Sequence, residues 1–144
     1  LGIIFSMNPT YERYWGGPNK MYSERLGKRY VETNKFREII DSGLTLCGGS
    51  DSDVCDYNPF VGIHSAVNHP VKKHRISLYE AIKMYTINGA YAIFEENNKG
   101  SLEIGKLADI IILDRDIFEI DTESIDKVKV LCTIKSGKIL YNTI

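Results

Sequence analysis

Asp51 is the side chain in this sequence with the strongest claim to a chemical role. It follows a short apolar segment, residues 44–47, through the small residues Gly48, Gly49 and Ser50. An acid directly after a buried strand stands where α/β barrels carry their functional side chains, and glycines let the backbone come close at that rim. The alternative is a structural role, in which the carboxylate caps the following loop. The position of a single acid is compatible with both roles.

The other reactive residue types form no catalytic or metal-binding motif. His64, His69 and His74 are spaced by five residues, whereas two imidazoles on one metal favour an i, i+4 or His-x-His spacing. We therefore expect surface or helix-end positions for all three. Cys47 is expected to pack in the core, and the basic residues 72–75 are expected to form a solvated loop. Neither a Gly-x-Ser-x-Gly nucleophile motif nor a glycine-rich phosphate loop is present.

Strands and helices alternate in the first part of the chain. Apolar residues 2–6 and 44–47 predict two buried strands, and periodic apolar residues predict helices over 21–30 and 35–42. The aromatic-rich residues 10–20 predict an irregular loop, whose rings either pack over the core or line a pocket.

Two further helices carry clear N-terminal signals. Asn58 is an N-cap residue followed by Pro59 at the first helical position. Ser77 and Glu80 form a capping box, in which each side chain accepts a hydrogen bond from a free backbone N–H group. The helix behind this box is expected to run to about residue 94.

The last third of the chain changes to strand patterns, with a tight hairpin turn at Ser136 and Gly137. The expected strands cover residues 108–113, 128–134 and 138–141. This change of periodicity predicts a domain boundary near residue 95, with one unit over residues 1–95 and another over residues 96–144. The fold class is therefore α/β.

Composition and charge exclude several classes of protein. The 144 residues carry 18 Lys and Arg against 19 Asp and Glu, a formal net charge of −1, which argues against a nucleic-acid partner. No apolar run approaches the ~18 residues of a transmembrane helix, so we expect no membrane partner. Three cysteines without a Cys-x-x-Cys pair favour a reducing, cytoplasmic location. The chain opens at Leu1 inside an apolar run without an initiator methionine, which favours a piece of a longer protein.

Four segments together resemble the amidohydrolase superfamily. Within it, the order of Asn8-Pro9, Gly49-Ser50-Asp51 and Asn58-Pro59, followed by Gly62-Ile63 and Ala66-Val67, is most similar to the YtcJ-like enzymes of the amidohydrolase 3 group. The most specific of the four segments has the sequence GSLEIGKLADIIILD and resembles the segment in which that family's chain leaves its barrel for a β-sandwich. The four segments are residues 49–51, 78–90, 100–114 and 130–141. The resemblance spans essentially the whole chain.

The resemblance implies a fold and a reaction. A complete (β/α)8 TIM-like barrel takes about 250 residues. The chain would therefore be a C-terminal fragment, with barrel strands 7–8 and their helices in residues 1–95 and C-terminal strands of a composite β-sandwich in residues 96–144. Such enzymes hydrolyse amide-like, non-peptide C–N bonds of small-molecule substrates with one or two divalent metals, for which we expect zinc. Asp51 would be both the metal ligand and the catalytic residue, which takes a proton from water and passes it to the leaving nitrogen.

This chain also departs from the family pattern. The family's metal-binding histidines have no counterparts here, so we expect the chain alone to be inactive and to bind a divalent metal weakly or not at all. Asp53 stands where relatives carry proline, close to Cys55 and Asp56, and it either alters the pocket or is a solvated loop charge. The alternative to an enzyme is a stand-alone, non-catalytic module for assembly or regulation. Strands 2–6 and 44–47 would lack their barrel neighbours, so we expect a homo-oligomer in which this region packs against its equivalent.

Overall fold

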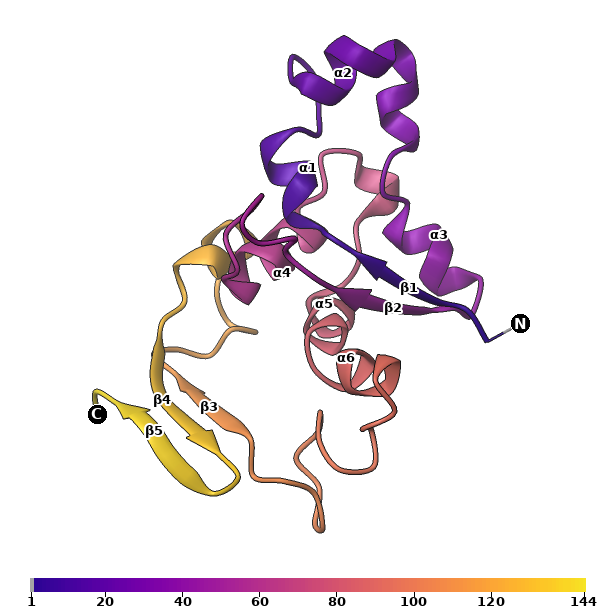
Figure 1. Ribbon diagram of the computed structural model, residues 1–144. Helices are drawn as coiled ribbons and strands as arrows, with labels where there is room; N and C mark the ends of the chain where they lie inside the picture. The colour runs from indigo at the N-terminus through magenta and orange to yellow at the C-terminus, as the bar shows by residue number, and fades with distance from the viewer. Residues whose placement is uncertain (1) are drawn as a thin grey trace.

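The two apolar segments near the start of the chain form a parallel strand pair in the computed structural model, which describes residues 2–144 (Figure 1). Strand β1 covers Ile4–Met7 and strand β2 covers Thr45–Gly48, with Met7 opposite Gly48 at their carboxyl ends. Both predicted strands are confirmed, each shifted by one or two residues. The opening residue, Leu1, lies outside the described residues.

The segment between these strands is more helical than the sequence predicts. Helix α1 covers Thr10–Tyr14, so the loop expected over residues 10–20 was wrong for its first five residues and holds for residues 15–20. The amide of Tyr11 donates to the carbonyl of Asn8, and Pro9 has φ −58°, so the proline starts the helix. Three more elements follow before β2: α2 over Met21–Leu26, a 3₁₀ helix over Gly27–Glu32 and α3 over Phe36–Asp41.

The locally encoded helix starts are confirmed. Helix α4 covers Pro59–Val67, and the Asn58 side chain accepts a hydrogen bond from the amide of Phe60 at 3.0 Å. Helix α5 covers Leu78–Met84 and begins with the predicted capping box. The single helix expected to reach residue 94 is instead broken at Thr86, after which α6 covers Ile87–Ala92. The Asn88 side chain donates to the carbonyl of Leu46 at 2.9 Å, which fastens α6 to β2.

A second, antiparallel sheet contains the C-terminal strands in the order β3-β4-β5 (Figure 1). These strands cover Ile110–Leu113, Val130–Lys135 and Lys138–Asn142. The hairpin turn lies at Ser136 and Gly137 as predicted, and positive φ angles of 50° and 77° suit a two-residue turn. Within residues 2–144 the two sheets form separate hydrogen-bonded ladders.

One buried apolar cluster nevertheless connects both parts of the chain. Phe36 and Leu46 from the first part pack in the same cluster as Ile117, Ile125 and Val128 from the second. Ile125 lies in a 3₁₀ helix over Thr122–Lys127 that packs against α4. None of the helices within residues 2–144 combines the length and apolarity needed to cross a membrane.

Candidate functional site

Asp51 lies at the carboxyl edge of the β1–β2 pair, where the sequence places it. Gly49 donates a backbone hydrogen bond to the carbonyl of Met7 at 2.8 Å, which extends the strand pairing by one residue. A Cβ atom at Gly49 would lie 2.9 Å from Oδ1 of Asn8, so a larger residue at this position would displace the Asn8 side chain. The turn then places Asp51 in the left-handed region, with φ +53°, and leaves its side chain exposed.

The carboxylate of Asp51 is held by a residue that sequence reasoning missed. The Tyr11 hydroxyl donates a hydrogen bond to Oδ2 of Asp51 from α1, on the neighbouring strand end. No hydrogen bond to Oδ1 occurs within residues 2–144. The hydrogen bond to Asp51, supported by desolvation and by the carboxylate charge, raises the pKa of the Tyr11 phenol. Tyr11 therefore remains a donor, and it fixes one carboxylate oxygen while the other faces solvent.

A groove of about 780 Å³ lies beside this pair. Trp15 forms part of its wall and packs on Tyr11, with ring centroids 4.6 Å apart. The groove is lined by aromatic, acidic and small residues: Tyr14, Trp15, Ser52, Asp53, Val54, Cys55, Asp56 and Tyr57. Of the two roles considered for the aromatic residues 10–20, lining a pocket applies to Tyr14 and Trp15.

The cysteines near the site are unsuited to nucleophilic attack. Cys55 is buried at the groove wall, and desolvation together with the charge of Asp51 raises the pKa of its thiol. A thiol with a raised pKa carries little thiolate at neutral pH. Cys47 is buried in β2, as expected, and its Sγ lies 3.4 Å from the carbonyl oxygen of Phe5.

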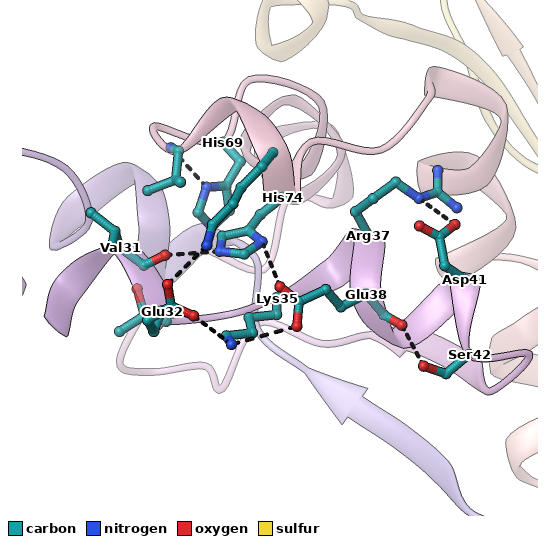
Figure 2. A network of polar contacts seen from close by, with 12 residues as sticks. Val31, Glu32, Lys35, Arg37, Glu38, Asp41, Ser42, His69 and His74 are labelled. Carbon is teal, nitrogen blue, oxygen red and sulfur yellow. Dashed lines mark hydrogen bonds and ion pairs between the residues drawn. The ribbon is translucent and has the colours of Figure 1, made fainter.

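Two of the three histidines correct the sequence interpretation. His69 and His74 were expected at surface or helix-end positions; His69 does follow the end of α4, yet both rings are fully buried. Their rings pack edge to face, and His69 packs in the same way on Phe36 at 5.5 Å. Figure 2 shows His74 against the carbonyl of Val31, with Nε2 2.9 Å from the oxygen, while Nδ1 of His69 accepts from the amide of Val71. Some of these partners are distant in sequence, and others are backbone groups. The periodicity of side chains along the sequence therefore does not reveal them.

Ion pairs lie beside the histidine pair (Figure 2). The Glu32 carboxylate contacts Lys35 at 2.5 Å and Lys73 at 2.8 Å, and these hydrogen bonds lower the pKa of Glu32 to about 2. Lys73 is exposed, as predicted for the basic loop, although its neighbour His74 folds inward.

A complete metal site is not formed by the described part of the chain. No group of three His, Cys, Asp or Glu side chains suitable for a metal occurs among residues 2–144. Catalytic zinc sites use three protein ligands and an open position. Asp51 can provide one ligand, and the donors present here do not fit a metal without others.

Comparison with known proteins shows one family. A model of the "Amidohydrolase family" matches residues 1–141. "Putative amidohydrolase YtcJ" of Bacillus subtilis (strain 168) is 33% identical over 129 residues, 82% of this chain and 24% of that protein. "N-substituted formamide deformylase" of Arthrobacter pascens is 29% identical over 148 residues, 98% of this chain and 27% of that protein. The chain thus spans about a quarter of the length of these relatives.

Solved structures agree with this match. An uncharacterized metal-dependent hydrolase from Pyrococcus furiosus superimposes with a TM-score of 0.67 at 28% identity, over 80% of this chain and 24% of that one. A 5-methylcytosine deaminase from Klebsiella pneumoniae shares the fold, with a TM-score of 0.70 at 23% identity over 99% of this chain and 34% of the deaminase.

Proposed function

The chain belongs to the amidohydrolase family, and from this premise we propose that it forms part of a metal-dependent hydrolase of amide-like, non-peptide C–N bonds. The observation that carries the proposal is the Asp51 carboxylate, which stands at the carboxyl edge of a parallel strand pair and is held there by Tyr11. A relative named for the deformylation of N-substituted formamides and a similar structure named as a metal-dependent hydrolase support this reaction class.

We propose that the two parts of the chain correspond to parts of a larger architecture. Residues 1–95 would contribute strands 7–8 of a (β/α)8 barrel, which is supported by the parallel β1–β2 pair and the helices between them. Residues 96–144 would contribute C-terminal strands of a composite β-sandwich, which is supported by the separate antiparallel sheet. A complete barrel takes about 250 residues, more than this chain contains.

In this proposal, Asp51 is both the catalytic residue and one ligand of a divalent metal, with zinc as the metal we expect. Such a metal lowers the pKa of bound water towards neutrality when it is present. The remaining ligands would come from outside residues 2–144, because the described residues form no group of three or more donors that could hold a metal. In hydrolysis, the hydroxyl of water adds to the carbonyl carbon and its proton ends on the departing nitrogen. Oδ1 of Asp51 is available to carry that proton, while Tyr11 holds Oδ2.

A non-catalytic module for assembly or regulation is the second candidate. It is favoured by the same lack of a three-ligand cluster within residues 2–144, and by the exposure of every residue of β5.

The test compares the complete open reading frame with the 144-residue chain. Two quantities are followed in both proteins. One is the amine released from N-substituted formamides, and the other is the bound metal, measured by mass spectrometry. We expect that only the complete protein hydrolyses the substrate. Asp51→Asn in this protein should lower the rate of hydrolysis by about 10²–10⁴-fold and leave the circular dichroism spectrum unchanged. Glu103→Gln, an exposed acid away from the site, serves as the charge-matched control. Unchanged hydrolysis after Asp51→Asn would refute the role assigned to Asp51. A complete protein that releases no amine and binds no metal would favour the non-catalytic module.

A further inference from the structure

We infer that the groove beside Asp51 binds the amine half of the substrate, as a planar group that carries a positive charge. The role of this ligand in catalysis rests on the proposed function. Its binding depends only on the walls and charges of the groove.

The groove is large enough for such a group and lies next to the Tyr11–Asp51 pair. Its volume of about 780 Å³ falls within the range of roughly 300–1,000 Å³ that is typical of small-molecule sites. Trp15 on its wall packs against Tyr11, and Tyr11 hydrogen-bonds Asp51. A ligand on the Trp15 ring is therefore separated from the Asp51 carboxylate by one side chain.

The aromatic walls are left uncovered in the chain. Tyr14 is 46% exposed and Tyr57 is 80% exposed, and the ring of Tyr14 lies 6.3 Å from that of Trp15. Aromatic side chains of this size usually bury most of their surface in a protein interior or against a ligand. Their faces attract cations, and tryptophan does so most strongly.

The charge of the groove has a single sign. Asp53 and Asp56 both line it with exposed carboxylates, and none of its lining residues is Lys, Arg or His. The neighbouring cation on α1, Arg13, is directed to Asp126, with 2.8 Å between Nη1 and Oδ2. The groove therefore repels carboxylate and phosphate groups and favours an ammonium or amidinium group.

The chemistry of C–N hydrolysis assigns this groove to the amine half. The bond between carbonyl carbon and nitrogen breaks, the hydroxyl from water remains on carbon, and the nitrogen takes a proton. An alkyl amine has a pKa near ~10, so the released amine takes up a second proton at neutral pH and becomes an ammonium ion. Carboxylates beside Asp51 complement that ion, whereas they would oppose the acid formed from the acyl half.

The single tryptophan of the chain makes the inference directly measurable, because Trp15 reports on the groove by fluorescence. The 144-residue chain is titrated with benzylamine, benzyl alcohol and benzoate, which share a ring and differ in charge. We expect saturable quenching by benzylamine, about 5-fold weaker binding of benzyl alcohol, and no binding of benzoate. The double variant Asp53→Asn/Asp56→Asn should weaken benzylamine binding by up to about 5-fold and leave benzyl alcohol unchanged. Glu103→Gln removes an exposed carboxylate outside the groove, and this control should change neither titration.

Tyr57→Leu gives a second variant that keeps the fold, because this ring is largely exposed. This variant should weaken the binding of benzylamine by about 3-fold or more. Equal binding of benzylamine and benzyl alcohol, or no saturable quenching in a folded chain, would overturn the inference. Hydrolysis by the complete protein that benzylamine does not inhibit would overturn this inference alone. Cation binding without hydrolysis would refute the proposed function and leave a cation site.

Discussion

Oε2 of Glu12 lies 3.6 Å from Nε2 of His69, and the two side chains are 1% and 0% exposed. Neither atom has a hydrogen-bond partner within residues 2–144. Because Nδ1 of His69 accepts from the amide of Val71, the proton of the neutral ring is on Nε2 and faces Glu12. Desolvation raises the pKa of Glu12, and desolvation together with His74 lowers the pKa of His69 to about 4. The neutral ring is thus the form that this fold stabilises.

The buried ring predicts a loss of stability in mild acid. The pKa of His69 is about 4 in the folded chain and 6.5 as its ordinary value, so the unfolded chain binds the extra proton first. The stabilisation is complete above pH 6.5 and is lost progressively as the pH falls towards 4. His69→Asn keeps an acceptor for the Val71 amide but cannot titrate. Between pH 6.5 and 4, the unfolding free energy of this variant should therefore fall by about 2–3 kcal/mol less than that of the original chain.

Urea denaturation at several pH values measures this difference. Glu12 acts in the opposite direction, because its raised pKa lets the folded chain take up a proton before the unfolded one does. Glu12→Gln should therefore make the decrease between pH 6.5 and 4 steeper. Parallel pH profiles for the original chain and His69→Asn would contradict the assignment.

Tyr11→Phe should release the Asp51 carboxylate without unfolding the chain. The hydrogen bond is exposed, so its loss should change the unfolding free energy by less than about 1.5 kcal/mol. The carbon-13 chemical shift of Asp51 Cγ should nevertheless change, because Oδ2 loses its donor. Tyr57→Phe removes a hydroxyl from an exposed ring and is the control. An unaltered Asp51 resonance in Tyr11→Phe would show that the two side chains do not interact in solution.

The features that the sequence could predict are local ones. The cap at Asn58 and the box of Ser77 and Glu80 involve atoms two or three residues apart, and both form as expected. The position of Asp51 after β2 was also predictable, because a strand and its following turn are adjacent in the chain.

The features that the sequence could not predict are contacts between residues that are distant in the chain. Tyr11 reaches Asp51 across 40 residues, and Glu12 meets His69 across 57. A five-residue helix such as α1 has too few turns to show an apolar period, so the segment read as a loop. Helix α1 is stabilised by the tertiary contacts of its buried residues Thr10 and Glu12, and these contacts cannot be predicted from local sequence.

Ile125→Ala should destabilise the whole chain and not only its C-terminal part. The side chain is fully buried in a cluster that includes Phe36 and Leu46. Removing it should cost about 2–5 kcal/mol. Trp15 fluorescence, which reports on the first part, should then show the unfolding transition at lower urea. Ile139→Ala, at a 63% exposed position of β5, should shift it little. If Ile125→Ala leaves the Trp15 transition unshifted, the chain consists of two independently folding units, divided near the proposed boundary at residue 95.

We propose, finally, that the chain associates with itself through the β1–β2 pair. Each of these strands has one hydrogen-bonded neighbour within residues 2–144, so an outer edge of each is available for pairing. Ile3, next to β1, is 50% exposed, and apolar surface left in water costs roughly 25 cal/mol per Å².

Sedimentation equilibrium at micromolar concentration should therefore show a species heavier than the 16.3 kDa of one chain. A lysine at a strand edge opposes pairing, so Ile3→Lys should shift the equilibrium towards the monomer. Ile139→Lys places the same charge on β5 and should leave the assembly intact, because the expected interface lies at the other sheet. Dissociation by Ile139→Lys alone would move the interface to β5, and a mass fixed at 16.3 kDa would show that no assembly forms.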